Sequence, residues 1–557
     1  METAVIIIAI LGGVFGAILA IAGKKLAVEE DPRKDEILAL LPGANCGGCG
    51  YAGCAAMADA IVAGQEEGAM KCAACAAENK KAIKAVMGLA ADDDENAVRM
   101  IPRLHCNGCK ENRPAKYKRE GVKNCFLAAA TAGGPGQCNF GCFGCGACVD
   151  ACSFGALAMG ENGLPQFDYD KCVGCGACAS TCPQFLIEMM KASNKVLVQC
   201  NNREKGKAAM TDCGVSCISC GLCAKNCPKQ AITMEDGVNG SIPVIDYDKC
   251  VSCGMCLVNC PFGAIVDKGQ IFQTIYAMKE GYDVIAAVAP AFVGQFGPAV
   301  TPDKVKAALK AVGFADVVEV AIGADLCTIE EAEDFLDKVP EKQPFMATSC
   351  CPAWSVMAKK NFPDFAPYIS MALTPMVLTG RLIKKEKPNA KVVFIGPCAA
   401  KKLEASRKSI RSDIDFVLTF EEVMGMFNAK GIALDQITTS DPLTEGTNAG
   451  RGFAVSGGVA KAVKDLIQKE HPGTEVKVQA AEGLKNCKTM LMMAKAGRLN
   501  GYLLEGMACP GGCVAGAGTL QPINKSSALV KKYATESDKK DADESAYGDR
   551  LHELSEH

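Results

Sequence analysis

The stretch Thr348-Ser349-Cys350-Cys351-Pro352-Ala353-Trp354 is the one around which the rest of the chain is organised. Two later segments complete it, Gly396-Pro397-Cys398-Ala399-Ala400-Lys401-Lys402-Leu403-Glu404 and Glu505-Gly506-Met507-Ala508-Cys509-Pro510-Gly511-Gly512-Cys513. Together they supply four well-placed thiolates and one spare cysteine, Cys350, which directly precedes a candidate ligand. We interpret the other cysteines, which lie upstream, as a route that carries electrons to or from this place.

The composition indicates iron–sulfur chemistry. Of 557 residues, 34 are cysteines, and most stand in C-x2-C-x2-C runs, which place three sulfurs around one cluster. Disulfides between such close thiols would be strained, and cluster assembly implies a reducing compartment. The length suits roughly three to five domains. A net charge of −3 gives no electrostatic argument for nucleic-acid binding.

Residues 1–25 are predicted to form a transmembrane anchor. Thr3 to Gly23 carry no charge, and as a helix they would span roughly 31 Å, enough to cross a bilayer. Lys24-Lys25 follow at once, which by the positive-inside rule keeps the bulk of the chain on the cytoplasmic side of the cytoplasmic membrane. The alternative is a cleaved signal peptide, but the stretch before the apolar run carries Glu2 and no Lys or Arg, and export would expose the cluster thiols to oxidant.

Residues 26–90 are expected to form a small four-cysteine iron–sulfur domain. Three cysteines lie in a glycine-rich loop and a fourth follows a helix expected at 55–63. Glycine lets the backbone fold close around the sulfurs and point N–H groups at them. The predicted ligands are Cys46, Cys49, Cys54 and Cys72, with Cys75 as the alternative fourth.

A connector at 95–137 holds cysteines that remain once the neighbouring motifs are filled. Together with the cysteine that follows it, the leftovers could bind another 4Fe–4S cluster, and the alternative is that they are buried free thiols. These candidates are Cys106, Cys109, Cys125 and Cys138.

An internal repeat follows, with one unit at 138–195 and another at 196–270. Each unit resembles a bacterial two-cluster ferredoxin, in which the fourth cysteine of each run ligates the other cluster. The first unit therefore groups Cys142, Cys145, Cys148 with Cys182, and Cys172, Cys175, Cys178 with Cys152. The second groups Cys217, Cys220, Cys223 with Cys260, and Cys250, Cys253, Cys256 with Cys227. Cys200 and Cys213 stay unassigned.

The pattern changes to α/β past residue 270. Short apolar strand candidates at 284–288, 392–395 and 501–504 alternate with amphipathic helices such as 302–312 and 458–469. The opening cysteines fall at strand ends or helix starts, where loops gather in such folds. We expect a two-lobed α/β domain at 271–523 and a charged, partly disordered tail at 524–557. The whole is thus a multidomain α/β and α+β chain.

The first 270 residues resemble the B subunit of the Rnf electron-transport complex. The resemblance rests on the anchor, the Asn45-Cys46-Gly47-Gly48-Cys49-Gly50 loop, Cys106-Asn107-Gly108, Ala132-Gly133-Gly134-Pro135 and the ferredoxin repeats. That family passes low-potential electrons at the cytoplasmic membrane face. The resemblance therefore implies soluble ferredoxin or Rnf-like membrane partners.

The last domain resembles iron-only ([FeFe]) hydrogenases through its three signature loops. The resemblance implies an H-cluster, a 4Fe–4S cubane plus a diiron subsite with CO, CN and a dithiolate bridge, inserted by maturation factors. Cys351, Cys398, Cys509 and Cys513 would hold the cubane, and Cys513 would bridge to the subsite. Cys350 would exchange a proton with the bridging amine. Lys401 would hydrogen-bond a cyanide, while Met507 and Ala289-Pro290-Ala291 would line the pocket.

The same resemblance implies a proton relay. Glu331 aligns with the family's relay glutamate, and Ser370, Asp334 and Lys338 align with the remaining positions, the last two as substitutions. Without the alignment, Glu331 reads as surface charge. Gly396 and Met376 depart from the family's usual methionine and glutamine beside the diiron site, and residues 516–522 carry an insertion.

Two functions follow from this sequence. The first is a membrane-anchored hydrogenase fed through five to six upstream 4Fe–4S clusters. The second is a non-catalytic conduit or redox sensor whose last domain carries only a cubane, as in eukaryotic iron–sulfur assembly factors. The doubled Cys350-Cys351 favours the enzyme. No nucleotide-binding motif supports direct use of NAD(H).

Overall fold

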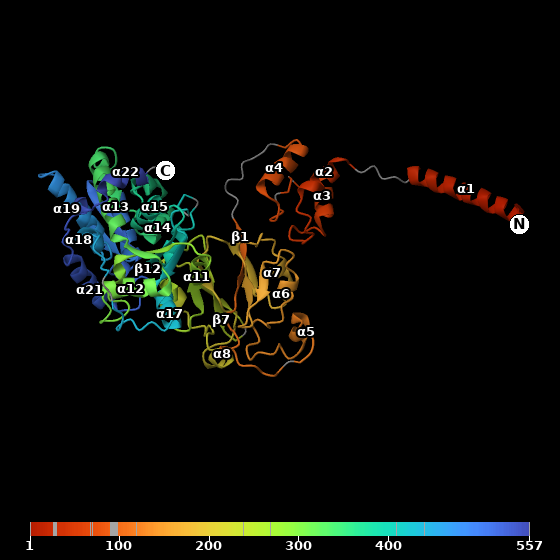
Figure 1. The fold of residues 1–557 in the computed structure, drawn as a ribbon, viewed down its shortest axis with the longest axis horizontal. Helices are drawn as coiled ribbons and strands as arrows, with labels where there is room; N and C mark the ends of the chain where they lie inside the picture. Colours follow the sequence, from red (N-terminus) through yellow and green to blue (C-terminus); the bar gives the residue numbers. More distant parts are fainter. Residues whose placement is uncertain are drawn as a thin grey trace. The chain divides into compact units, whose positions relative to one another are not determined.

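The computed structural model describes residues 2–555 except 26–30, 67, 70, 90–98, 119, 238, 268, 408, 411 and 439–440, with backbone only for 2–9 and 23–25. The chain divides into two compact units (Figure 1). The first contains Met1–Leu104, Arg119–Gly134 and Phe143–Lys191. The second contains His105–Lys118, Pro135–Cys142 and Ala192–His557.

The chain begins with helix α1, Glu2–Lys25. Among the residues whose placement is described, no helix combines the length and hydropathy needed to cross a bilayer. The anchor predicted at 1–25 falls on α1, whose side chains are described only for 10–22, and it stays a prediction.

Three helices form the small domain that follows, α2 (Arg33–Leu40), α3 (Cys54–Val62) and α4 (Ala77–Val86). They pack around a core in which Ile37, Ile61 and Ile83 are fully buried. The helix expected after the glycine-rich loop is α3, and it begins at Cys54 itself. The loop cysteines are thereby held against a small apolar core.

Both ferredoxin units have the same plan. In the first, β1 (Met100–Leu104) pairs with β4 (Ile187–Lys191) and β2 (Leu157–Met159) with β3 (Pro165–Phe167), all antiparallel. In the second, β5 (Val196–Val198) pairs with β8 (Ile265–Asp267) and β6 (Ile232–Asp236) with β7 (Ser241–Ile245). Strand β1 thus belongs to the first ferredoxin fold, although the sequence placed its residues in the connector at 95–137.

A glycine precedes each of the four short helices that carry the third cysteine of a run. These helices are α6 (Ala147–Asp150), α7 (Ala177–Thr181), α9 (Leu222–Lys225) and α10 (Met255–Val258). The glycines adopt left-handed φ values between 69° and 86°, which a side chain would strain. Two further helices, α5 (Cys125–Ala130) and α8 (Lys207–Asp212), lie outside this repeat.

The last domain contains two parallel sheets. One has the strand order β10-β9-β12-β13 and the other β11-β15-β14. Their bounds are β9 Val284–Val288, β10 Asp316–Glu319, β11 Phe345–Ala347, β12 Lys391–Gly396, β13 Phe416–Thr419, β14 Lys477–Glu482 and β15 Tyr502–Met507. Each predicted strand lies in or overlaps one of these.

Helices cover both faces of the four-stranded sheet. The helices of this domain are α11 Ile271–Lys279, α12 Pro302–Val312, α13 Ala321–Lys338, α14 Pro352–Asn361, α15 Pro375–Glu386, α16 Ala399–Glu404, α17 Phe420–Ala429, α18 Asn448–Gly452, α19 Gly458–Glu470 and α20 Leu484–Lys495. Alternate residues of β9 enter different cores, Val284 with α12 and α17, and Ile285 with α13 and α15. Every residue of β9 is therefore buried, as expected for a strand of a covered parallel sheet.

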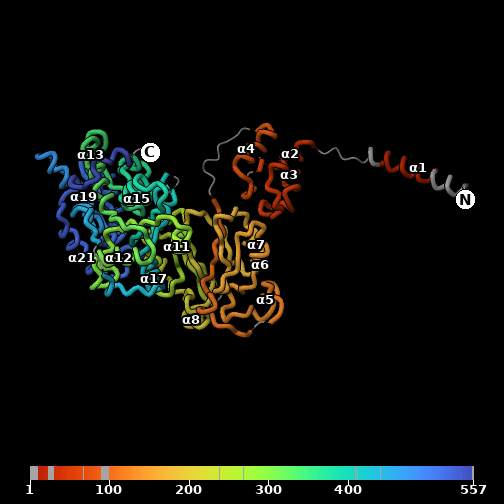
Figure 2. Tube along the Cα trace, in the orientation of Figure 1, coloured from red at the N-terminus to blue at the C-terminus, as the bar shows by residue number. Residues whose placement is uncertain are grey.

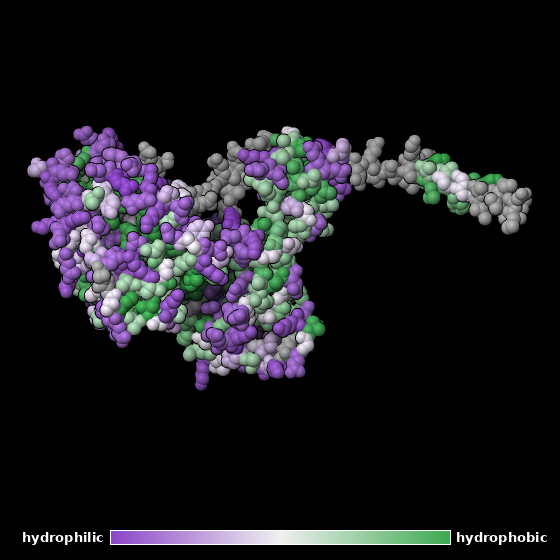
Figure 3. Space-filling view, viewed as in Figure 1, coloured by the Kyte–Doolittle hydropathy of each residue, from purple (hydrophilic) through white to green (hydrophobic). Residues whose placement is uncertain are grey.

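The tail is ordered over most of its length, which corrects the prediction for 524–557. Helices α21 (Ile523–Thr535) and α22 (Leu551–Ser555) pack on the last domain. Val530 and Tyr533 enter one core of the four-stranded sheet, and Leu551 and Leu554 enter the other. The visible surface over α18, α19 and α21 is largely hydrophilic (Figure 3). The many charges thus occupy the outer faces of amphipathic helices. The prediction of disorder was wrong because it used the charged composition and not the position of the apolar residues.

Val530→Asp tests the docking of α21. The substitution buries an unpaired carboxylate at a fully buried position, which should destabilise the docked helix by about 3 kcal/mol. Limited proteolysis should then cut the tail roughly a hundredfold faster, because cleavage follows the open population. Ala528→Asp, at an exposed position of the same helix, should behave as wild type. Equal cleavage of the two variants would show that α21 is not docked.

Candidate active site

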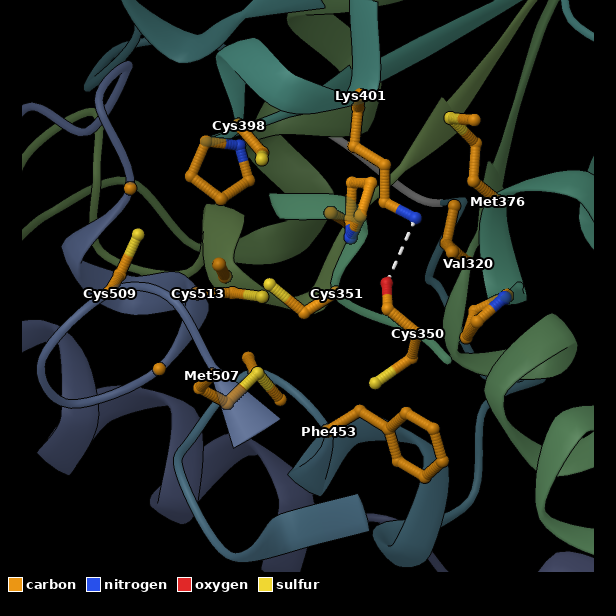
Figure 4. Close-up of a pocket in the computed structure, with 18 of the residues that line it drawn as sticks. Val320, Cys350, Cys351, Met376, Cys398, Lys401, Phe453, Met507, Cys509 and Cys513 are labelled. Carbon is orange, nitrogen blue, oxygen red and sulfur yellow. Dashed lines mark hydrogen bonds between the residues drawn. The ribbon is translucent and has the colours of Figure 1, made fainter. Parts of the chain in front are cut away.

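A cavity of about 860 Å³ lies at the carboxyl ends of strands from both sheets. Cys350 and Cys351 follow β11, Cys398 follows β12, and Cys509 follows β15. All line the cavity, together with Cys513 and with Ala289-Pro290-Ala291 after β9 (Figure 4). Loops after parallel strands meet at one edge of a sheet, so segments far apart in sequence converge here.

The four candidate ligands are held at defined backbone positions. Cys351 and Cys398 are the N-cap residues of α14 and α16, and Cys513 begins a short 3₁₀ helix. The Ala508 N–H donates to Cys351 Sγ at 3.5 Å. Burial raises the pKa of all four thiols, that of Cys398 to about 11 and that of Cys513 to about 12. Thiols in such a site lose their protons when a metal takes their place, so the donor set fits a sulfur-ligated iron cluster.

Cys350 lies beside this set. Its sulfur is on the side of Met507 and Phe453, while the Cys351 and Cys513 sulfurs face each other (Figure 4). Burial raises the pKa of the Cys350 thiol well above its ordinary value, and the neighbouring Glu331 adds to the effect. Cys350 is therefore a protonated, buried thiol at neutral pH.

Lys401 is a buried cation on the wall of the cavity. Its Nζ donates to the Cys350 carbonyl oxygen at 3.2 Å and pairs with the Glu404 carboxylate at 2.7 Å. The Thr374 hydroxyl donates to the same carboxylate at 2.7 Å. Burial opposes the charge, but Glu404 outweighs it and raises the pKa of Lys401. Glu404 and Thr374 thus position Lys401, a role that sequence reasoning missed although Glu404 stands three residues on in the same motif.

Glu331 is fully buried on α13, which corrects its reading as surface charge. Its Oε1 accepts from the Ser349 N–H at 3.3 Å, and the Ser370 hydroxyl bonds to the same carboxyl. Burial nevertheless raises its pKa to about 8. The structure thus brings Glu331 and Ser370 together behind Cys350.

Asp334 and Lys338 lie further along the same helix. They form an ion pair of 2.8 Å, with 27% and 35% of their side chains exposed. They are therefore the partly exposed members of the predicted relay, while Glu331 is its buried member.

The two sequence departures meet the cavity differently. Met376 lines it directly. A Cβ placed on Gly396 would lie 2.5 Å from the Phe394 ring, which itself lines the cavity. Phe394 thus fills the space that a side chain at 396 would need.

Cysteines of each predicted ferredoxin grouping lie near one another, including the crossed fourth cysteines. A cavity of about 360 Å³ is lined by Cys227, Cys250, Cys253 and Cys256. Cys217, Cys220, Cys223 and Cys260 are close neighbours in the same unit. In the other unit, Cys182 lies near Cys148, and Cys152 lies near Cys175. Cys253 also lines the 860 Å³ cavity, so a ferredoxin site adjoins the candidate active site.

The small N-terminal domain gathers its predicted cysteines. Cys46, Cys49, Cys54 and Cys72 line a cavity of about 380 Å³, which Cys175 also touches. The alternative ligand, Cys75, is not among the lining residues, and its thiol faces the Leu40 carbonyl oxygen at 3.9 Å. The geometry therefore favours Cys72 over Cys75.

The connector cysteines do not gather as predicted. Cys106 and Cys138 line a cavity of about 290 Å³ with Cys200 and Cys213, which the sequence left unassigned. Cys125 packs instead with Ala128 and Phe143, and Cys109 does not line the cavity. The predicted ligand set of Cys106, Cys109, Cys125 and Cys138 is therefore wrong for two members, Cys109 and Cys125. The only available signal was that Cys200 and Cys213 also remained after the motifs were filled.

Among the residues that the structure describes, no three histidine, cysteine or acidic side chains are placed to hold a single metal ion. The same holds for the ferredoxin cysteines. A cubane carries an iron at each of four corners, so its ligands stand farther apart than ligands of one ion.

Family comparisons divide the chain in the same way. The family described as iron only hydrogenase large subunit, C-terminal domain, matches residues 282–517. One 4Fe-4S dicluster family matches residues 141–186 and 216–264, and a second matches residues 171–232. A family for an iron–sulfur cluster domain matches 41–77.

Two kinds of relative are similar to the chain. It is 39% identical over 249 residues to the B subunit of the Na⁺-translocating ferredoxin:NAD⁺ oxidoreductase complex of Acetobacterium woodii, covering 44% of this chain and 71% of that protein. It is 32% identical over 290 residues to the periplasmic [Fe] hydrogenase large subunit of Nitratidesulfovibrio vulgaris, covering 43% and 68%. A structure of the [FeFe]-hydrogenase HydA1 from Chlamydomonas reinhardtii has a TM-score of 0.43 at 21% identity, covering 51% of this chain and 94% of that chain.

The fold and its cysteine sites define an oxidoreductase with several iron–sulfur domains. The chain belongs to the iron-only hydrogenase large-subunit family and carries an N-terminal region that is similar to the B subunit of Rnf complexes.

Glu331 should be protonated at neutral pH. A carboxyl with a pKa of about 8 keeps its proton below that pH and becomes anionic above it. Infrared difference spectra should therefore contain a protonated-carboxyl band at pH 6 that fades with a midpoint near pH 8. The band should be missing in Glu331→Gln and present in Glu330→Gln. An ionised Glu331 at pH 6 would contradict the predicted shift.

Proposed function

We propose that the chain is an [FeFe] hydrogenase that forms or oxidises dihydrogen at an H-cluster held by Cys351, Cys398, Cys509 and Cys513. The observation that carries the proposal is the fifth buried thiol, Cys350, beside these four. A cluster that only transfers electrons needs no protonated group next to it, whereas a proton-coupled reaction does.

The size of the cavity supports a second group beside a cubane. Its 860 Å³ is more than twice the 360 Å³ of the ferredoxin cavity, and six cysteines line it against four. When bound, the diiron subsite supplies reversible heterolytic cleavage of dihydrogen. Lys401 offers a cation to anionic groups there, and Ala289 to Ala291, Met376 and Met507 exclude water.

The protein's part in proton transfer begins at Cys350. Its thiol holds a proton inside the cavity, and Glu331 behind it also carries one at neutral pH. Ser370 orients the Glu331 carboxyl. From there the proton reaches the partly exposed Asp334 and Lys338 on the same helix.

Electrons enter through the ferredoxin site that contains Cys253. The wall that Cys253 shares with Cys398 and Cys509 brings the two sites close. Because the relatives of the N-terminal region are named as parts of ferredoxin:NAD⁺ oxidoreductase complexes, we propose soluble ferredoxin or Rnf-like proteins as electron partners. The proposed place of action is the cytoplasmic face of the membrane.

Infrared spectroscopy of matured protein tests the function. Carbonyl and cyanide bands are expected if the cavity holds a diiron subsite. The second candidate, a non-catalytic conduit or sensor, predicts cubane signals without these bands. Their absence after maturation would therefore reject the hydrogenase and favour the conduit.

Cys350→Ala isolates the proton role. It should lower hydrogen turnover by roughly 10²–10⁴-fold, the usual contribution of a positioned acid–base group, and leave the iron content unchanged. The matched control is Cys487→Ala, since Cys487 is also a fully buried thiol near Cys351 but bonds only backbone carbonyls. This control should stay within a few-fold of wild type. Undiminished turnover in Cys350→Ala would refute the role.

A further inference from the structure

The cavity lined by Cys106, Cys138, Cys200 and Cys213 is built like the ferredoxin sites. Its volume of about 290 Å³ is close to the 360 Å³ of the cavity lined by Cys227, Cys250, Cys253 and Cys256. All four of its cysteines are buried. The trace in Figure 2 shows how the orange connector approaches the yellow segment near α8, so that distant parts of the chain supply the four.

Backbone N–H groups surround the sulfurs in both sites. In the smaller cavity, Cys142 N–H donates to Cys106 Sγ at 3.5 Å, while Asn202 N–H and Cys217 N–H donate to Cys200 Sγ at 3.4 and 3.3 Å. In the ferredoxin cavity, Ser252 N–H donates to Cys250 Sγ at 3.4 Å, and Ala231 N–H donates to Cys227 Sγ at 3.3 Å. Such donors stabilise thiolates and tune cluster potential.

A cation also lines the smaller cavity. The Arg113 side chain runs across two glycines, where a Cβ on Gly136 or Gly141 would lie 2.5 or 2.6 Å from guanidinium atoms. The glycines therefore let a positive charge approach the thiols closely. A cluster held by four thiolates is anionic, and this charge favours it.

We propose that Cys106, Cys138, Cys200 and Cys213 bind a 4Fe–4S cluster. Assembly exchanges four thiol protons for four iron–sulfur bonds to a preformed cluster. Free thiols do not require this pattern of N–H donors and cation.

The site extends the electron route. Cys200 contacts the ferredoxin site of Cys217 and Cys260 within one buried group. The site of Cys217 and Cys260 adjoins the next ferredoxin site, because Cys223 of the first lies near Cys256 of the second. Cys253 of that second site lines the active-site cavity. The proposed cluster is thus the outermost of three that lead inward, and its presence does not depend on hydrogen chemistry.

Iron and sulfide counting on the full-length reconstituted protein tests the proposal. Cys200→Ala/Cys213→Ala should contain about four iron and four sulfide fewer per chain than wild type. The matched control, Cys109→Ala/Cys125→Ala, removes two cysteines from the same region and should keep the wild-type count. The reverse result, or equal counts in both variants, would overturn the ligand set.

A conservative variant covers the case in which the double substitution disturbs the fold and more than four iron are lost. Cys213→Ser keeps a ligand of similar size. It should preserve the iron count but change the electron paramagnetic resonance spectrum of one reduced cluster, because oxygen replaces one sulfur ligand. A spectrum identical to wild type, or stoichiometric zinc in the purified protein, would refute the proposal.

Discussion

The arrangement of the last domain depends on one constraint, that thiols from distant segments must be buried together at the edge of two parallel sheets. The carboxyl ends of β9, β11, β12 and β15 deliver their loops to the same cavity. Burial there keeps uncoordinated thiols protonated. Iron can displace the protons of four of them, and Cys350 keeps its own. The division between ligands and acid follows from this difference.

The same constraint explains the charged residues around the cavity. Lys401 is stable in an apolar wall only because Glu404 neutralises it, and Thr374 in turn holds Glu404. Glu331 has no such cation among its bonded partners, so burial raises its pKa. A salt bridge would instead lower the pKa of a carboxylate. A fixed cation and a protonated acid are therefore both neighbours of Cys350.

Sequence alone predicted most of the cysteine groups, because ferredoxin ligands are set by local spacing. Cys182 and Cys152 were assigned across runs because each repeat resembles a two-cluster ferredoxin. Spacing failed for Cys200 and Cys213, since their cavity is closed by a connector that returns from far away in sequence. Sequence patterns also missed the burial of Glu331 and the docking of α21, because both depend on tertiary packing. A charged composition hid the apolar faces of α21 and α22.

The central claim is that the active-site cavity and the clusters beside it form one electron route. Exposing oxidised, matured protein to dihydrogen without mediator tests it, with cluster reduction followed by electron paramagnetic resonance. If the route is continuous, dihydrogen should reduce the ferredoxin clusters. Clusters that stay oxidised under dihydrogen, while dithionite reduces them, would contradict it.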